Sequence, residues 1–288
     1  MEIEIEGRLL HLEVAGPEEA PPVLFLHGLS ASGETFAWLP DEVTARRRVL
    51  RMDLRGHGRS DPAPGAYTVA DYGGDVVGVL REAVGRPAVL VGHSLGACVA
   101  WWVAQQHPEL VRAALLEDPP LYLGEAAEHA ANPHLPLFAE IRDAARAWQA
   151  EAADPVEIAR QIAAEPAVRA GIPAGSGPAT VGEVLTPDAP LAIADGMLAM
   201  DPEVMSAAAK RLTLGELDTT APVAVPVLLL AAGVAPAFRA EHAARLARTH
   251  PAVEVRRIEG AGHEIHDEAG HRETYLAILA EFLGRHAG

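Results

Sequence analysis

The sequence predicts an α/β protein in which helices cover both faces of a mostly parallel sheet. Short apolar runs alternate with segments of helical spacing over most of the chain, which is the order that strand–helix–strand units produce. The apolar runs are continuous, as is typical of parallel strands buried on both faces. With 288 residues, 49% of them hydrophobic, the chain suffices for one large α/β domain with an insertion or for two small domains.

The expected elements follow one another in a regular order. Segment 1–16 alternates apolar and polar residues and predicts a two-stranded hairpin. Six later apolar segments each end at proline or glycine and predict a short strand, so that with the hairpin the sheet has eight strands in all. These runs lie at 21–28, 47–58, 87–92, 111–120, 225–233 and 253–260, and helical spacing is found at 34–45, 68–84, 97–107, 236–250 and 268–286.

The alternation of strands and helices stops between the sixth and the seventh strand. This stretch is rich in Ala, Glu and Pro, and the patterns at 136–152 and 154–165 predict helices. Segment 171–182, rich in glycine, is expected to be flexible. The expected division is therefore a core of residues 1–118 and 223–288, interrupted by a helical insertion of residues 119–222.

The composition excludes several classes of partner. A formal charge of −17 would repel nucleic acids and anionic membranes. A single cysteine, Cys98, permits neither an internal disulfide nor a cysteine-based metal site. The N-terminus does not resemble a signal peptide, and no apolar run has the length of a membrane span. We expect a soluble cytoplasmic protein that acts on a small molecule; the sequence leaves its oligomeric state open.

Ser94 lies between Gly92 and Gly96, where a predicted strand meets a predicted helix. The pattern Gly-x-Ser-x-Gly at such a junction is typical of a nucleophile elbow, a turn so tight that flanking side chains would collide. The two glycines remove those side chains and leave the Ser94 hydroxyl at the carboxyl edge of the sheet. The amide of Leu95 is then free to stabilise an oxyanion. The alternative is a glycine-rich packing turn with an incidental serine.

The loop after the first buried strand is expected to supply a second oxyanion donor. In HGLSAS (27–32), Gly28 permits a close backbone approach and the Leu29 amide is the expected donor. Ser30 is expected to add a hydroxyl to the substrate pocket. The alternative is that this segment is simply a turn.

Four motifs resemble those of the α/β-hydrolase family in order and spacing: HGLSAS, DLRGHGRSD (53–61), GHSLG (92–96) and GAGH (260–263). The resemblance covers the whole chain except the insertion, which corresponds to the variable cap domain of that family. It implies the α/β-hydrolase fold, with a helical cap inserted between strands 6 and 7. In that family the loop at 53–61 is structural, so the resemblance implies that His57 is not catalytic.

The resemblance also implies a catalytic histidine on the loop after the last strand. His263 follows Gly-Ala-Gly directly, a flexible approach that allows its imidazole to reach Ser94. An imidazole of near-neutral pKa can take the serine proton and return it. We predict His263 as this base. The competing residue is His266, which fits a helix interior better.

The acid that orients this histidine does not stand in the usual place. Most members of the family carry it after strand 7, but Pro236 stands there, and the next acid, Glu241, falls in a helix pattern. Certain haloalkane dehalogenases and lactone hydrolases carry it after strand 6, which resembles the placement of Asp118, 24 residues after Ser94. We predict Asp118. Neighbouring strand residues point to opposite faces, so Glu117 is the alternative and not a second acid.

The predicted chemistry follows from the serine. A serine nucleophile forms an acyl-enzyme with a carbonyl substrate, so we predict hydrolysis of an ester or lactone of small to medium size. The resemblance disfavours epoxide hydrolases and dehalogenases, which are expected to carry aspartate at that position. The alternatives are a C–C bond hydrolase, a perhydrolase, a biosynthetic cyclase or acyltransferase, and a non-catalytic ligand-binding protein. No metal or organic cofactor is implied, because the thirteen histidines are scattered.

The substrate is expected to be largely apolar. The insertion carries apolar side chains that either line a pocket or, for the most part, pack against one another. No cluster of basic residues predicts a site for phosphate or coenzyme A. The apolar side chains in question are Leu135, Leu137, Phe138, Trp148, Met197, Leu198 and Met200.

Overall fold

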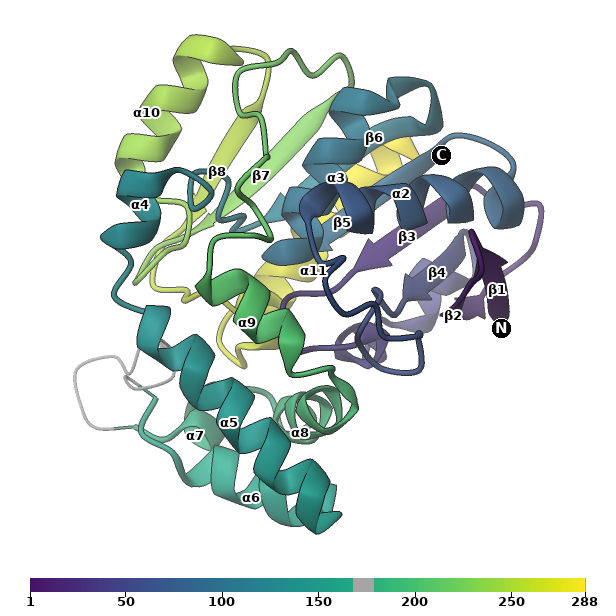
Figure 1. Cartoon of the computed structure of the whole chain (residues 1–288). Helices are drawn as coiled ribbons and strands as arrows, with labels where there is room; N and C mark the ends of the chain where they lie inside the picture. The colour runs from purple at the N-terminus through teal and green to yellow at the C-terminus, as the bar shows by residue number, and fades with distance from the viewer. Residues whose placement is uncertain (168–178, 288) are drawn as a thin grey trace.

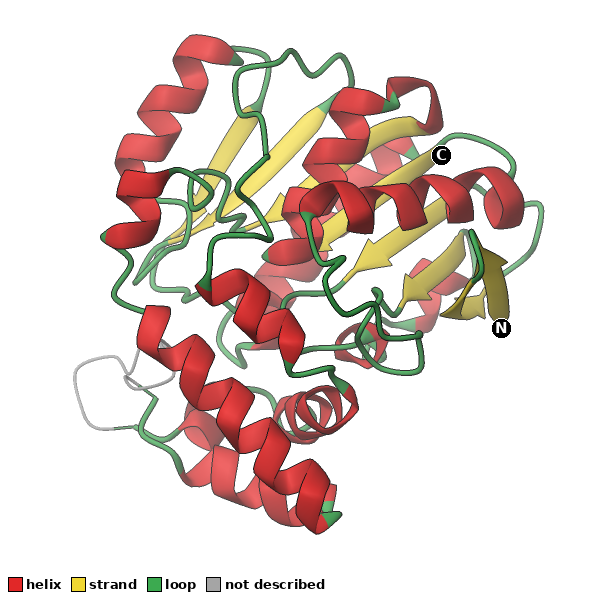
Figure 2. Cartoon of the chain, in the orientation of Figure 1, coloured by secondary structure: helices red, strands yellow, loops and turns green. Residues whose placement is uncertain are grey.

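The structure is a computed structural model that describes residues 1–167 and 179–287. Over these residues the sheet has eight strands in the order β1-β2-β4-β3-β5-β6-β7-β8 (Figures 1 and 2). Strands β1 and β2 pair antiparallel, β2 is antiparallel to β4, and the remaining neighbours are parallel. The strands are β1 (Glu2–Ile5), β2 (Arg8–Ala15), β3 (Pro22–Leu26), β4 (Arg48–Met52), β5 (Ala88–His93), β6 (Val111–Glu117), β7 (Val227–Ala232) and β8 (Glu254–Ile258). The predicted fold class is confirmed.

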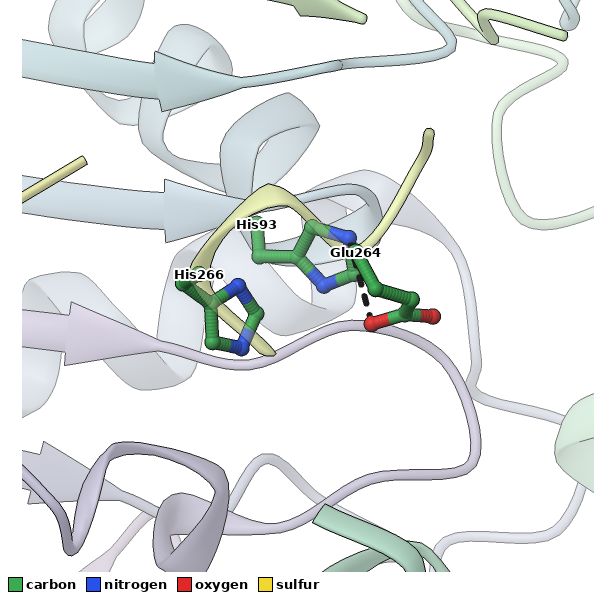
Figure 3. Close-up of side chains that lie close together, drawn as sticks. All are labelled: His93, Glu264 and His266. Carbon is green, nitrogen blue, oxygen red and sulfur yellow. Dashed lines mark ion pairs between the residues drawn. The ribbon is translucent and has the colours of Figure 1, made fainter. Parts of the chain in front are cut away.

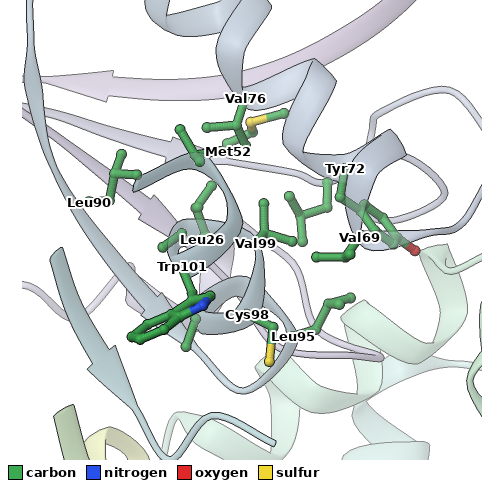
Figure 4. Close-up of a cluster of buried hydrophobic side chains, with 14 of the residues drawn as sticks. Leu26, Met52, Val69, Tyr72, Val76, Leu90, Leu95, Cys98, Val99 and Trp101 are labelled. Atoms are coloured by element: carbon green, nitrogen blue, oxygen red, sulfur yellow. The ribbon is translucent and has the colours of Figure 1, made fainter. Parts of the chain in front are cut away.

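Helices cover both faces of the sheet. Because successive side chains of a strand point to opposite faces, Leu24 and Leu26 enter one apolar cluster, whereas Val23 and Phe25 enter another. Figure 4 shows part of the first cluster, in which Cys98 is buried among aliphatic and aromatic side chains. Helices α2 (Val69–Val79), α3 (Leu95–Gln106) and α10 (Ala240–Thr249) contribute to the first cluster, and α1 (Asp41–Thr44) and α11 (Arg272–His286) contribute to the second.

Between β6 and β7 the described chain is helical. Figure 1 shows α5, α6, α7 and α8 stacked together apart from the sheet, and Ala167, Val181, Leu185 and Ala189 form a small buried cluster among them. The helices are α4 (Ala126–Ala130), α5 (Leu135–Glu151), α6 (Pro155–Ala164), α7 (Val181–Val184), α8 (Ala189–Ala199) and α9 (Glu203–Ala209). The domain boundaries at 119 and 222 remain a prediction. The part of the predicted flexible segment at 171–178 lies outside the described residues.

Two predicted helices are shorter in the structure. The pattern at 34–45 is divided into a 3₁₀ turn, Gly33–Phe36, and the single turn of α1, which begins after Pro40. Proline disfavours helical backbone in the residue before it, so the helix is interrupted there. The pattern at 236–250 becomes helical only at Ala240, because the preceding residues form a loop around Asp118. In the described part of the chain, every helix is too short or too polar to cross a bilayer.

Candidate active site

Ser94 occupies the turn that joins β5 to α3. Its backbone has φ 49° and ψ −112°, a conformation that costs free energy for a residue with a side chain. A Cβ on Gly96 would lie 2.1 Å from the Leu26 carbonyl oxygen, and one on Gly92 would lie 2.5 Å from the Gly96 carbonyl oxygen. Only glycine therefore fits on either side of Ser94, for the steric reason expected from the sequence.

His263 connects Ser94 to Asp118 through two hydrogen bonds. Its Nε2 lies 3.0 Å from Ser94 Oγ, and its Nδ1 lies 2.7 Å from Asp118 Oδ2. An ionised carboxylate only accepts hydrogen bonds, so Nδ1 carries the proton, and in the neutral ring Nε2 accepts from the serine hydroxyl. The three residues follow β5, β8 and β6, parallel strands whose carboxyl ends lie at the same edge of the sheet.

Three main-chain amides hold the Asp118 carboxylate. The N–H groups of Ala232 and Phe238 each donate to Oδ1 at 3.2 Å, and that of Ala237 donates to Oδ2 at 2.8 Å. Asp118 is fully buried and has φ 38° directly before Pro119. Burial by itself raises the pKa of Asp118, but the bond to His263, the charge of that ring and the amides outweigh burial and lower the pKa below its ordinary value.

The Asp118 carboxylate also raises the pKa of His263. Burial by itself lowers the pKa of His263, but the hydrogen bond and charge of Asp118, with a smaller contribution from Glu264, raise it to about 9. The Asp118–His263 pair is therefore stabilised in its charged form. Such stabilisation of an imidazolium is what a general base requires after it has taken a proton.

A second carboxylate–histidine pair lies directly beside the first. Glu117 is fully buried and accepts hydrogen bonds from the main-chain N–H of His266, at 3.0 Å, and from its Nδ1, at 2.9 Å. Nε2 of His266 lies 3.1 Å from Thr35 Oγ1, whose hydroxyl donates to Asp267. Both ring nitrogens of His266 are thus engaged away from Ser94. The structure does not bring Glu117 or His266 to the serine.

Among the residues that the structure describes, one group of side chains has metal-ligand character. Figure 3 shows His93, Glu264 and His266, whose candidate ligand atoms lie within 4.8 Å of one another. His93 Nε2 lies 3.1 Å from the His263 carbonyl oxygen, and both nitrogens of His266 are engaged as described above. A metal here would have to displace these hydrogen bonds. The hydrogen bond of His93 connects the loop of His263 to β5, so the group has a structural role.

The loop after β3 lies against the serine. A Cβ on Gly28 would lie 3.3 Å from Ser94 Cβ, so the backbone of this loop is close to the nucleophile. Leu29 and Leu95 both line the cavity in front of Ser94, and the Leu95 amide, as the first N–H of α3, has no acceptor within its helix.

Ser30 is placed differently from its neighbours. It has φ 60° and does not belong to the residues that line the cavity. Its carbonyl oxygen packs against α8, where a Cβ on Gly196 would lie 2.6 Å away. The structure therefore brings Leu29 and Leu95 to the cavity but not Ser30.

The cavity in front of Ser94 has a volume of about 410 Å³. Apolar side chains make up most of its lining, including two of those singled out in the insertion, Leu137 and Phe138. Met197 and Met200, from the same set, are buried away from it. The cavity thus offers an apolar space that ends at a hydroxyl and an imidazole.

The loop at 53–61 ties segments of the core together. Arg55 donates to both oxygens of Asp75, at 2.6 and 2.7 Å, and Asp53 accepts from the amide of Gly33 at 2.7 Å. His57 is fully buried, its Nδ1 lies 2.9 Å from the Arg55 carbonyl oxygen, and burial lowers its pKa to about 3. It does not line the cavity, in agreement with a structural role.

Several polar groups around the site were missed by the sequence reasoning. The amides that hold Asp118 belong to alanine and phenylalanine residues. Main-chain N–H groups occur in nearly every residue, so the sequence does not show which of them bind Asp118. Glu268 accepts from the Gly262 amide at 2.7 Å, next to His263, and burial raises the pKa of Glu268 to about 7. Its position five residues after His263 was the only signal, and it was not specific.

Known proteins share this sequence pattern and architecture. A sequence model described as alpha/beta hydrolase fold matches residues 21–270. A 2-(acetamidomethylene)succinate hydrolase of Mesorhizobium japonicum is 34% identical over 140 residues, 47% of this chain and 50% of that protein. Epoxide hydrolase B of Mycobacterium tuberculosis is 36% identical over 114 residues, 37% of this chain and 32% of that protein. The matches thus span half or less of these curated relatives.

Among solved structures, the enol-lactonase from Burkholderia xenovorans superposes with a TM-score of 0.71. The superposition covers 99% of this chain and all of that one, at 17% sequence identity. At this level of identity the likeness concerns the fold alone.

Proposed function

This chain belongs to the alpha/beta hydrolase fold family, and from that premise we propose that it is a serine hydrolase of an ester or lactone. The proposed substrate is of small to medium size and largely apolar, and it reacts through an acyl-enzyme. The observation that supports the proposal is the hydrogen-bonded chain from Ser94 Oγ through His263 to Asp118, at 3.0 and 2.7 Å. A nucleophile bonded to a base, which a third group orients, is the arrangement that acyl transfer requires.

In the proposed acylation, neutral His263 takes the Ser94 proton at Nε2 while Oγ bonds to the substrate carbonyl carbon. The carbonyl electron pair moves to its oxygen, and the N–H groups of Leu29 and Leu95 stabilise this oxyanion. When the carbonyl re-forms, the bond to the alkoxide breaks and the His263 imidazolium protonates the leaving oxygen.

Deacylation repeats these steps with water. His263 takes a proton from water, the hydroxide oxygen bonds to the acyl carbon, and collapse of the second oxyanion breaks the bond to Ser94 Oγ. The imidazolium returns its proton to Oγ, so the products are an acid and an alcohol, or a hydroxy acid from a lactone. Asp118 keeps the proton of the neutral ring on Nδ1 and stabilises the imidazolium in both steps.

The substrate class rests on three supports. The cavity of about 410 Å³ is lined mainly by apolar groups and suits a small to medium organic molecule. The proteins similar in sequence include a hydrolase named for an acetamidomethylene succinate. A serine at position 94 leads to an acyl-enzyme, which an epoxide cannot form because it has no acyl carbon.

Turnover of an activated ester tests the proposal. We expect the protein to hydrolyse 4-nitrophenyl butyrate over many turnovers, and Ser94→Ala to abolish this activity. Ser206→Ala is the matched control, since Ser206 is a buried serine of α9 outside the cavity lining. Loss of the mass shift with a fluorophosphonate in Ser94→Ala would identify the nucleophile.

Two results would contradict the proposal. Turnover that persists in Ser94→Ala would show that Ser94 is not the nucleophile. Labelling by the fluorophosphonate without repeated turnover on activated esters, lactones or diketones would favour a ligand-binding protein on this fold. A diketone cleaved in preference to esters would instead favour a C–C bond hydrolase.

A further inference from the structure

Arg211 adds a cation to the lining of the cavity that contains Ser94 and His263. Its Nη1 donates to the Gly124 carbonyl oxygen at 2.9 Å, which holds one side of the guanidinium. Arg211 is an exposed residue, and the edge formed by Nε and Nη2 has no hydrogen-bond acceptor and no carboxylate partner within residues 1–167 and 179–287. That edge is the one that binds a carboxylate with two parallel hydrogen bonds.

The backbone at Arg211 is unusual for an arginine. Lys210 caps the C-terminus of α9, and Arg211 follows with φ 63°, in the left-handed region that helix ends usually fill with glycine. Its amide donates to the Ala208 carbonyl, and the next amide donates to the Ala207 carbonyl, which closes the helix. The chain therefore places a long cationic side chain at the cavity where glycine would be less strained.

The other charged groups of the cavity already have partners. Arg239 donates to Glu128, which also lines the cavity, and to Glu241 outside it, both at 2.5 Å. Asn132 accepts the His134 amide at Oδ1, which leaves the two N–H groups of its side chain without a described partner. The free hydrogen-bonding capacity of the lining therefore includes the donors of Arg211 and Asn132.

The charge balance of the lining differs from that of the whole chain. The chain carries a formal charge of −17. The charged lining residues, histidines aside, are Arg211, Arg239 and Glu128, so the described cavity carries one net positive charge. A ligand that complements it has one negative charge on an otherwise apolar body, which is the chemistry of a carboxylic acid at neutral pH.

We propose that the cavity contains a carboxylate-binding subsite with Arg211 as its cation, and that the substrate is an ester or lactone with a free carboxylate away from the reacting carbonyl. This rests on the proposed function and narrows its substrate class. Because the surface charge repels anions at long range, the selectivity arises from contact with Arg211 and not from electrostatic steering.

A matched pair of esters tests the subsite by kinetics. The monoester 4-nitrophenyl hydrogen adipate carries a free carboxylate, and 4-nitrophenyl hexanoate has an acyl chain of equal length without one. Because Arg211 is an exposed residue, we expect kcat/KM to favour the adipate by about three- to fivefold, the range of an ion pair that water partly screens. In Arg211→Gly this ratio falls to about one, chiefly through a higher KM for the adipate.

The variants separate the subsite from folding. Glycine suits the backbone at position 211, so Arg211→Gly is expected to fold. Lys210→Gln removes the same charge one residue away, outside the cavity lining, and is expected to retain the wild-type ratio. Equal kcat/KM for the two esters in the wild type, or equal loss in Lys210→Gln and Arg211→Gly, would overturn the subsite while the proposed hydrolysis stands.

Binding to Ser94→Ala keeps the two proposals distinguishable. We expect calorimetry to show that monomethyl adipate binds about three- to fivefold more tightly than dimethyl adipate, and that adding Arg211→Gly removes the difference. If this preference is found and neither nitrophenyl ester is turned over, the subsite stands and the proposed hydrolysis fails. If monomethyl adipate and dimethyl adipate bind with equal affinity, the subsite is overturned.

Discussion

Asp118 and Glu117 are consecutive residues at the end of β6, and each holds a histidine of the same loop. Asp118 Oδ2 lies 2.7 Å from Nδ1 of His263, and Glu117 Oε2 lies 2.9 Å from Nδ1 of His266. Neighbouring strand side chains point to opposite faces, which separates the two pairs. Nε2 of His263 meets Ser94 Oγ at the cavity, whereas Nε2 of His266 meets Thr35 Oγ1 in the interior.

The difference between the pairs lies in their surroundings and not in their chemistry. In both, burial lowers the pKa of the histidine but the neighbouring carboxylates outweigh it and raise the pKa to about 9. His263 lines a cavity, so it can exchange a proton with a substrate. His266 is fully buried and has no such route. The first pair suits catalysis, and the second suits the stability of the loop that carries the first.

The largest effect is expected from removing the charge of the first pair. Asp118→Asn should lower kcat by about 10⁴, because a neutral amide neither fixes the ring tautomer nor stabilises the imidazolium. Steady-state hydrolysis of an activated ester measures this, with Glu117→Gln as the matched neutralisation of the neighbouring residue. Near-normal kcat in Asp118→Asn would assign the role of the acid elsewhere.

The second pair is expected to act on stability. Glu117→Gln should lower the free energy of unfolding by about 3–5 kcal/mol, since it leaves a buried histidine without its anionic partner. Urea unfolding at neutral pH measures this loss. An unchanged midpoint in Glu117→Gln would show that the pair contributes nothing to the fold.

The contribution of His266 to stability should depend on pH. Its folded pKa of about 9 exceeds the ordinary 6.5, so its contribution is complete below pH 6.5 and is lost as pH rises through 9. The carboxylates of Glu117, Asp267 and Glu264 raise its pKa, and Arg272 donates to its main-chain carbonyl oxygen. The difference in unfolding free energy between wild type and Glu117→Gln should therefore shrink above pH 9.

The pH dependence of kcat/KM should depend on the Asp118–His263 pair and not on the Glu117–His266 pair. A general base acts when neutral, so kcat/KM should rise with pH up to about 9, the pKa to which Asp118 raises His263. In Asp118→Asn only burial remains to act strongly on the ring, and the inflection should move by about 1–3 pH units toward acid. Glu117→Gln should leave the inflection near its original pH; an equal displacement in both variants would refute the assignment.

The smallest effect is expected at Glu241, the first acidic residue after Pro236, which stands where most members of the family carry the catalytic acid. Glu241 is exposed and pairs with Arg239 on the surface. Glu241→Gln should change the unfolding free energy by less than about 0.5 kcal/mol and kcat by less than about twofold. A loss comparable with that of Asp118→Asn would show that the acid follows strand 7 after all.

Local patterns predicted the fold better than the details of the site. Apolar alternation and the glycines around Ser94 are short-range signals, and the eight strands and the nucleophile turn follow from them. The division of the helix expected at 34–45 depends on Pro40, which is present in the sequence but does not alter the helical spacing of the apolar residues. The catalytic roles of Ser94, His263 and Asp118 remain predictions, although the structure brings these residues together.

By itself, the sequence determined the fold class and the strained turn of the serine between two glycines. It also determined that Pro236 stands where most members of the family carry the catalytic acid. Each of these depends on neighbouring residues or on residue identity alone. Only the tertiary structure decided which carboxylate meets which histidine, since that depends on the faces of β6 and on the path of a loop more than a hundred residues away. It also decided that the amides of Ala232, Ala237 and Phe238 hold Asp118. Main-chain donors are the same in every residue except proline, so no sequence pattern shows where they point.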